Sequence, residues 1–355
     1  MTSIKRSAAV LTLLLAACTH GSVLPNAGQN AAPAAAPAAA RATQMFVSPL
    51  TVPGKIVVLP ATAKGTVTPN RTIDGFIPNF ALNYFLAYDA KAKRIWGTAC
   101  LESGATGGPI VAWPANAAGS KAKPAVVIQG KNTGLSGCQT GIALDSAGDV
   151  YVADLISSPP LYPGGQVAIF KSGQHGNAAP SRRIAGTKAV LKSPEGVALD
   201  AKGNLYVANS CQGFNPCTSG INIYPPGASG NIAPIATIGG KKTNILAAFG
   251  VALDAAGNVY VADAAGAIEI FKAGSTGNVG PVRFIAGDKT QIRTPSGIAV
   301  DGAGYIYLGN FDQSTSNNNW PILVFAPTAA GNVPPVQVIR VKSKRFDQPS
   351  GIAIR

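Results

Sequence analysis

Two groups of polar residues recur at fixed places in the chain and could carry chemistry. The first group directly precedes the copies of a repeated phrase, as Glu195 precedes Gly-Val-Ala-Leu-Asp at 196–200. Its members are Tyr84, Thr140, Glu195, Phe249, Ser296 and Ser350. The second group ends a second repeated phrase and consists of Asp154, Asn209, Asp263 and Asn310. Oxygen-bearing side chains of this kind can hold calcium, which takes about six to eight oxygens, and a lone carboxylate with a raised pKa can act as a general acid or base.

The composition of these groups limits that chemistry. Glu195 is the only carboxylate of the first group, so it is the candidate catalytic residue and has no partner carboxylate or histidine there. The residues of the second group have a structural alternative, which we favour, because Asp and Asn at strand ends commonly bond the backbone of the adjacent loop. We therefore predict neither a metal site nor a cofactor, with calcium held by Glu195 and Asp154, Asn209 or Asp263 as the alternative.

The sequence lacks the motifs of several common metal, catalytic and nucleotide-binding sites. His20 and His175 are the only imidazoles, and no pair of cysteines has the Cys-x-x-Cys spacing of many zinc and haem sites. The sequence also has no Gly-x-Ser-x-Gly elbow and no Gly-rich loop followed by Lys-Ser or Lys-Thr. We expect the chain not to be a triad hydrolase or a nucleotide-binding enzyme.

Four repeated phrases define the elements that must position these residues. The first phrase lies at 141–145, 196–200, 250–254, 297–301 and 351–355, with a degenerate copy at 85–89; the second lies at 150–154, 205–209, 259–263 and 306–310. An Asp-x-x-Gly turn joins the two phrases as a tight hairpin. A third phrase, such as Ile-Glu-Ile-Phe at 268–271, leads through Gly-Asn-x-x-Pro into a fourth strand near Ile-x-Gly. Four strands in about fifty residues are typical of a propeller blade.

The number of phrases predicts an all-β, six-bladed β-propeller with four antiparallel strands in each blade. First-strand and third-strand phrases each occur six times. The chain ends on a first strand at 351–355, and the segment 44–48 reads as a second strand without its own first strand. We predict that these two segments pair, close the ring and leave no open edge.

The phrases resemble the NHL-repeat family of six-bladed propellers. The family pattern Pro-x-Gly-[Ile/Val]-Ala-[Val/Leu]-Asp followed by Tyr-Val-Ala-[Asp/Asn] is matched with leading prolines at Pro194, Pro295 and Pro349, and the likeness covers nearly everything after residue 44. It implies the fold and leaves the function open, because such propellers include enzymes, nucleic-acid binders and protein-binding modules. The related gluconolactonase-like propellers bind calcium with Glu, Asn and Asp in the ring where this chain has only Glu195.

The N-terminal segment predicts export and lipidation. Residues 1–17 contain Lys5 and Arg6 and an apolar run from Ala8 to Ala17, which is too short to span a bilayer and is typical of a signal peptide. The run ends in Leu-Ala-Ala-Cys, which resembles a bacterial lipobox with Cys18 as the acylated residue; an ordinary cleaved signal is the alternative. Residues 18–43 read as an Ala/Pro-rich tether, and residues 44–355 as the propeller. We expect a lipid-anchored protein, in the outer membrane, facing the periplasm or the surface.

Four further cysteines predict disulfide bonds in an exported chain. Four cysteines allow three pairings. Cys211 and Cys217 lie in one loop, and Cys100 and Cys138 fall on the same predicted face, so we predict these two pairs. They either stiffen a binding surface or protect the fold, and we favour protection.

The chain is basic, and its charge gathers on one predicted face. The net charge is +14, and removing Lys5 and Arg6 with the signal peptide leaves +12. Second-to-third-strand loops and blade-to-blade connections should emerge on the same face. The cations predicted to bind there are Lys188, Lys192, Lys241, Lys242, Lys289, Arg293, Lys344 and Arg345, together with Lys131 and Lys342. A cationic face attracts anionic partners, although loop lysines that only maintain solubility are the alternative.

These features together predict a binding or scaffold module rather than an enzyme. Its partner would be an anionic envelope component, a glycan or a protein, and we expect a monomer. Export argues against nucleic acid as the partner. The alternative function is a metal-dependent lactonase or lyase with Glu195 at the channel mouth.

Overall fold

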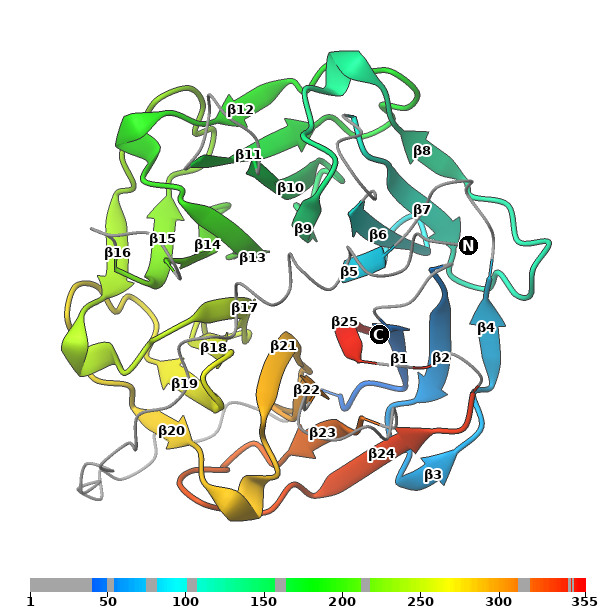
Figure 1. Ribbon diagram of the computed structural model, residues 1–355, viewed down its shortest axis with the longest axis vertical. Helices are drawn as coiled ribbons and strands as arrows, with labels where there is room; N and C mark the ends of the chain where they lie inside the picture. The colour runs from blue at the N-terminus through cyan, green and yellow to red at the C-terminus, as the bar shows by residue number, and fades with distance from the viewer. Residues whose placement is uncertain are drawn as a thin grey trace, which may run out of the picture.

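A computed structural model describes residues 40–49, 54–74, 82–100, 107–156, 164–211, 218–311, 320–343, 346 and 348–355, without the side chains of residues 82–84, 100, 156 and 311. The described strands form six sheets arranged around a central axis, and the prediction of an all-β six-bladed propeller is confirmed (Figure 1). The predicted signal peptide, Cys18 and nearly all of the predicted tether lie outside the described residues. No helix within the described ranges is long and apolar enough to cross a bilayer.

Each blade consists of four antiparallel strands in the order predicted from the phrases. Blade 1 contains β25 (Pro349–Ile354), β1 (Gln44–Pro49), β2 (Ile56–Pro60) and β4 (Arg71–Ile73), and blade 2 contains β5 (Leu82–Asp89), β6 (Arg94–Cys100), β7 (Ile110–Pro114) and β8 (Val126–Ile128). Blade 3 contains β9 (Gln139–Leu144), β10 (Val150–Ile156), β11 (Gly164–Phe170) and β12 (Arg182–Ile184), and blade 4 contains β13 (Ser193–Leu199), β14 (Leu205–Ser210), β15 (Gly220–Tyr224) and β16 (Ala236–Gly239).

The last two blades follow the same plan. Short 3₁₀ turns connect each of blades 2 to 5 to the blade that follows it. Blade 5 contains β17 (Ala248–Leu253), β18 (Val259–Asp263), β19 (Ala267–Phe271) and β20 (Arg283–Ile285), and blade 6 contains β21 (Thr294–Val300), β22 (Ile306–Phe311), β23 (Ile322–Phe325) and β24 (Gln337–Val341). The turns are η1 (Lys131–Thr133), η2 (Thr187–Ala189), η3 (Lys241–Thr243) and η4 (Asp288–Thr290). Each turn joins the outermost strand of one blade to the innermost strand of the next.

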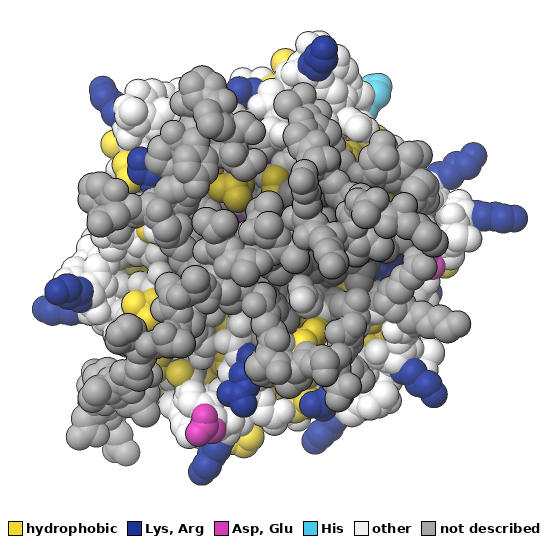
Figure 2. Space-filling model, in the orientation of Figure 1, with side chains coloured by type: hydrophobic (Ala, Val, Ile, Leu, Met, Phe, Trp, Pro, Cys, Tyr) yellow, Lys and Arg dark blue, Asp and Glu magenta, His cyan; other side chains and the backbone are white. Residues whose placement is uncertain are grey.

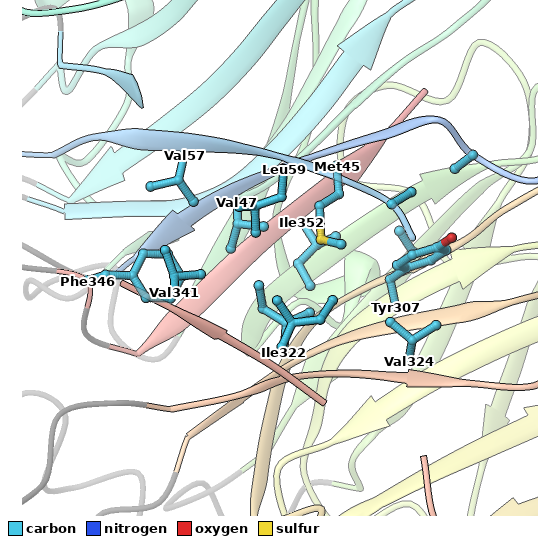
Figure 3. Packing of buried hydrophobic residues seen from close by; sticks show 14 residues of the cluster. Met45, Val47, Val57, Leu59, Tyr307, Ile322, Val324, Val341, Phe346 and Ile352 are labelled. Carbon is cyan, nitrogen blue, oxygen red and sulfur yellow. The ribbon is translucent and has the colours of Figure 1, made fainter. Parts of the chain in front are cut away.

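The two ends of the propeller segment close the ring by pairing. β1 lies antiparallel to β25, with Val47 opposite Ile352, as the phrase count predicted. The side chains of Met45, Val47 and Ile352 pack against Ile322 of blade 6 in the apolar core between these blades (Figure 3). Similar clusters fill the other blade boundaries. The core therefore lies between blades, so each blade needs both neighbours to bury its apolar side chains.

Glycine in the first phrase allows the innermost strands to approach one another closely. A Cβ added to Gly196 of β13 would lie 2.8 Å from Val251 N and 2.9 Å from Phe249 O of the next blade. Gly141, Gly250 and Gly297 meet carbonyl oxygens of their neighbouring blades at shorter range still. No φ in the left-handed region accompanies these positions, so space rather than backbone conformation requires glycine there.

A second set of contacts fastens the outer edges of the blades. The outermost strand of each blade bridges in parallel to a glycine in the third-to-fourth-strand connection of the next blade, as Ile128 bridges to Gly176. The further pairs are Ile73–Gly119, Ile184–Gly230, Ile238–Gly277 and Ile285–Gly331. Between blades 6 and 1 the corresponding contact is a short strand, β3 (Gly65–Val67), which pairs in parallel with β24 as the fifth strand of the blade 6 sheet. These bridges cover strand edges that would otherwise be open to pairing with other chains.

Residues preceding the predicted propeller segment also contact the fold. The Arg41 guanidinium lies over the Tyr305 ring, 4.0 Å from its centroid, and donates to Gln337 Oε1. The backbone N–H of Ala42 donates to Asp301 Oδ2. These contacts lie at the β21–β22 hairpin, so the chain enters the propeller at the face formed by the first-to-second-strand hairpins.

We predict that Arg41→Ala destabilises the propeller. The change removes the cation–π contact and leaves Gln337, which is buried, without one hydrogen bond, so the free energy of unfolding should fall by about 1–2 kcal/mol. Urea unfolding of the wild type, Arg41→Ala and the control Lys64→Ala, which changes an exposed side chain, measures the difference in the free energy of unfolding. An Arg41→Ala midpoint equal to that of Lys64→Ala would contradict the assigned contact.

Candidate binding face

The second-to-third-strand loops and the blade-to-blade connections share one face, which we call the loop face. Hydrogen bonds show this directly, because the polar residues that end the second strands bond to the connections. Asn209 Oδ1 accepts from Lys192 N at 2.9 Å, and Asn209 Nδ2 donates to Val190 O at 3.1 Å. Asn310 makes the matching pair with Arg293 N and Gln291 O. The opposite face carries the hairpins and is called the hairpin face.

The two aspartates of this group are occupied in the same way. Asp263 accepts three backbone N–H groups, from Leu246 at 2.6 Å, Ala247 at 2.9 Å and Ala265 at 2.8 Å. Asp154 accepts the backbone N–H and the hydroxyl of Ser136. It also accepts the side-chain amides of Gln139 and Gln166. Burial raises the pKa of both carboxyls, and these hydrogen bonds oppose the increase. All four residues of the group hold the connections in place, which is a structural role.

The residues before the first-phrase glycines occupy β-bulges in the innermost strands. In β13, for example, the register shifts between Pro194 and Val197. Equivalent shifts occur in the innermost strands of the other blades. Thr140 Oγ1 donates to Pro194 O at 2.7 Å, and Ser296 Oγ donates to Pro349 O at 2.8 Å. Ser350 Oγ donates to Ser48 O. The Thr140 and Ser296 hydroxyls thus join neighbouring blades, whereas the Ser350 hydroxyl bonds within blade 1, between β25 and β1. The side chain of Tyr84 lies outside the described residues.

Two phenylalanines meet across the ring. Phe249 in blade 5 stacks on Phe85 in blade 2, with 5.7 Å between ring centroids and 27° between ring planes. These blades lie opposite each other in the strand order. Phe85 stands where the other blades have the first-phrase glycine, and it is buried. The stack places an apolar barrier on the axis where a central channel would run.

Glu195 is buried and has a raised pKa. Its Oε1 accepts from Ser193 Oγ at 2.9 Å, and 2% of the residue is exposed. Loss of hydration on burial raises the pKa of the carboxyl to about 8, against a smaller lowering by the Ser193 hydrogen bond. A carboxyl group with such a pKa can donate a proton in its neutral form and accept one in its charged form. In the described part of the chain, however, no three His, Cys, Asp or Glu side chains gather as a metal site.

The cations of the loop face are carried by connections with a common structure. Each of the four connections starts with a glycine of positive φ, namely Gly130, Gly186, Gly240 and Gly287, and continues into a 3₁₀ turn. We call residues 130–136, 186–192, 240–246 and 287–293 the basic connections. Their described exposed cations are Lys131, Lys188, Lys241, Lys242, Lys289 and Arg293, and Lys192 is half-buried. Lys344 and Arg345 lie outside the described residues.

Asparagines of the Gly-Asn-x-x-Pro phrase fix these turns, a role that the sequence reasoning missed. Asn231 Oδ1 accepts from Lys188 N at 2.7 Å, and Asn278 Oδ1 accepts from Lys242 N at 2.7 Å. Asn177 and Asn332 make the same bond to Asn132 N and Lys289 N. A Cβ on Gly240 would lie 2.7 Å from Asn278 Oδ1, which explains the glycine of the Ile-x-Gly phrase. The sequence did contain a signal for this role, because the Gly-Asn-x-x-Pro asparagine recurs in each blade whose preceding connection begins with the Ile-x-Gly glycine.

The charge is distributed around the rim of the molecule. In the view of Figure 2, Lys and Arg side chains project at intervals around the circumference, and Asp and Glu side chains are few. Asp288 is an exposed carboxylate within the basic connections, whereas Glu195, Asp154 and Asp263 are buried. The accessible charge of the basic connections is therefore strongly positive.

Two of the predicted disulfide cysteines lie within the described residues. Cys138 directly precedes β9 and Cys211 directly follows β14, so both lie near the loop face. Cys217 and the side chain of Cys100 lie outside the described residues, so the predicted pairs remain a prediction.

Comparisons with known proteins support the fold alone. No protein-family model matches the chain, and no curated protein sequence matches it. Among solved structures, the chain is similar to a PQQ-bound aldose sugar dehydrogenase from Streptomyces coelicolor, with a TM-score of 0.52, 14% identity, and coverage of 81% of this chain and 94% of that chain. It is also similar to the WD40 β-propeller domain of Doa1, with a TM-score of 0.52, 12% identity, and coverage of 84% and 80%. At such identities the two proteins share a propeller architecture with this chain.

Proposed function

We propose that this chain is an exported, lipid-anchored β-propeller of the NHL-repeat type that acts as a binding module. Its loop face would recognise an anionic component of the bacterial envelope, a glycan or a protein. The observation that carries this proposal is the set of exposed cations on four consecutive connections, each fixed by an asparagine of the next blade. These bonds fix the backbone from which the cations project. A positive surface of this kind attracts an anionic partner and speeds its encounter.

The other candidate sites support a binding role rather than catalysis. The polar ends of the second strands hold backbone groups, and the Phe85–Phe249 stack lies on the axis. The alternative of a metal-dependent lactonase or lyase rests on Glu195 and its raised pKa. The donors proposed to join Glu195 do not fit calcium, because Asp263 already accepts three backbone N–H groups.

A charge-reversal experiment tests the proposed function. The loop-face variant combines Lys188→Glu, Lys242→Glu and Lys289→Glu; the control combines Lys91→Glu, Lys202→Glu and Lys272→Glu on the hairpin face, which changes the net charge equally. All six lysines are exposed. We expect the loop-face variant to bind immobilised dextran sulfate about 100-fold more weakly than the control, because three attractive charges become repulsive. Equal binding by the two variants would contradict the proposal.

The enzyme alternative has its own test. Stoichiometric calcium in the purified chain, a lower melting temperature after chelation, and loss of the metal in Glu195→Gln would favour it. We expect an unchanged melting temperature after chelation, because the side-chain oxygens of Asp154, Asn209 and Asp263 already accept hydrogen bonds from protein donors.

A further inference from the structure

Two exposed apolar side chains stand among the cations of the basic connections. Leu246 is 69% exposed, in the connection that also carries Lys241 and Lys242. Val190 is 45% exposed, between Lys188 and Lys192 in the preceding connection. The other exposed large apolar residues of the described chain are Ile235, Val282 and Val336. Each directly precedes an outermost strand, away from the basic connections. The loop face therefore presents apolar side chains within a cationic setting.

The backbone at Val190 makes its exposure more informative. Val190 has a φ of 56°, in the left-handed region, where a β-branched residue is a genuine outlier. The equivalent positions after the other turns are Gly134, Asn244 and Gln291. Glycine and asparagine adopt this conformation more readily than valine does. Val190 thus combines backbone strain with solvent exposure of its apolar side chain. Strain of this kind is most often found where a residue serves binding or catalysis.

We infer that the loop face docks on an anionic phospholipid bilayer, with Leu246 and Val190 inserted among the headgroups and the neighbouring lysines on lipid phosphates. This inference rests on the proposed function and names its partner. Interfacial membrane binding combines buried apolar area with electrostatic attraction to anionic lipids, and each lysine near such a surface contributes separately. The two connections supply both components within seven residues each.

A lipid surface fits these residues better than a soluble polyanion does. A polymer in water offers lysines its charges but offers Leu246 no apolar phase. Proteins that bind single-stranded nucleic acids often stack the bases on exposed aromatic rings, and none of the exposed large apolar residues in the described part of the chain is aromatic. Because the chain enters at the hairpin face, the docking face lies on the opposite side of the propeller from the predicted tether.

Vesicle sedimentation tests this inference with residues 40–355. That segment contains every described strand, including the β1–β25 and β24–β3 pairs that join the two ends of the ring, so it includes all the strand pairings of the fold. The probes are vesicles of phosphatidylcholine alone and of phosphatidylcholine with phosphatidylglycerol. The variants are Leu246→Ser on the loop face and, as a matched control, Ile235→Ser, which removes an apolar side chain that is 61% exposed.

We expect sedimentation with the anionic vesicles and none with the neutral ones. Leu246→Ser should weaken binding about tenfold, because serine lacks the apolar surface that leucine would bury among the headgroups. Lys242→Glu should weaken binding at least about fivefold, and Ile235→Ser should leave it unchanged. Circular dichroism of each variant verifies that the fold is retained.

The other outcomes separate this inference from the proposed function. Absence of vesicle binding, or equal binding by Leu246→Ser and Ile235→Ser, overturns the lipid inference. If dextran sulfate binding still depends on Lys188, Lys242 and Lys289 in that case, the proposed function stands with a polymer as the partner. If reversing those lysines changes neither vesicle binding nor dextran sulfate binding, both proposals fail.

Discussion

Replacing Gly196 by alanine should destabilise the propeller far more than the same replacement at a glycine whose added Cβ would meet only ordinary contacts. The new Cβ would lie within 3.0 Å of Val251 N and Phe249 O, which are backbone atoms of the neighbouring innermost strand. Backbone atoms cannot rotate away, so the two blades must move apart. Overpacking of this kind costs about 1–3 kcal/mol and occasionally more, and we expect about 3 kcal/mol here.

The matched control is Gly280→Ala. Gly280 has no left-handed φ, and its Cβ would meet only Lys242 O at 3.7 Å, which is ordinary contact. This variant should unfold at nearly the wild-type denaturant concentration, since alanine also restricts the unfolded chain. Urea unfolding of both variants measures the difference. A Gly196→Ala midpoint as high as that of Gly280→Ala would mean that the innermost strands do not approach as described.

Replacing Glu269 by leucine should stabilise the propeller at alkaline pH. Glu269 lies on β19 and is fully buried, and both its carboxylate oxygens lack a hydrogen-bond partner among the described residues. Its neighbours Ile268 and Ile270 pack toward blade 6, whereas Phe271, on the side of Glu269, packs toward blade 4. The equivalent residue of blade 6 is the buried Leu323, so leucine suits this position in the repeat.

The pH dependence of the free energy of unfolding follows from the direction in which the pKa of Glu269 is shifted. Burial, and secondarily the charge of Asp263, raises the pKa of Glu269 well above its ordinary value of 4.5. A raised pKa in the folded state gives stability that is fully present below the ordinary pKa and lost as pH rises toward the folded value. While the group stays protonated, each pH unit in that interval costs about 1.4 kcal/mol. The gain from Glu269→Leu should therefore be at least about 2 kcal/mol at pH 8 and smaller at pH 4.5.

Glu195 should contribute to the same trend. Its pKa is raised to about 8, so the stability linked to it is lost between about pH 4.5 and pH 8. Denaturant unfolding of the wild type, Glu269→Leu and Glu195→Gln from pH 4.5 to 8 resolves the two contributions. A Glu269→Leu curve parallel to that of the wild type would contradict the assigned burial of a neutral carboxyl.

The sequence was sufficient to predict the blades because each blade repeats one local unit. Glycine before Ile-Ala or Val-Ala, Asp-x-x-Gly turns and alternating apolar strands recur at similar spacing, and the unpaired phrases at 44–48 and 351–355 required one another. The parallel strand at 65–67 was not predicted, because its three residues carry no strand pattern and pair only across the last blade boundary.

The site was harder to predict because it depends on contacts between blades. The phrase alignment placed Phe249 in the ring of candidate residues, but its partner is Phe85, which replaces a glycine of the opposite blade. The sequence around either phenylalanine does not predict that stack. Arg41 likewise stood in an Ala/Pro-rich segment, and its role depends on Tyr305 and Gln337, more than 260 residues away in the chain.

Lysine reactivity in cell envelopes, where we propose that this chain resides, tests most directly whether the loop face is the binding face. An acetylating reagent would be applied to intact envelopes and to the purified full chain, and modification would be measured at each lysine. We predict that Lys188, Lys242 and Lys289 react more slowly in envelopes than in the purified chain, while Lys91, Lys202 and Lys272 on the hairpin face react equally in both. Equal reactivity of all six lysines in the two samples, or protection confined to the hairpin face, would contradict the account.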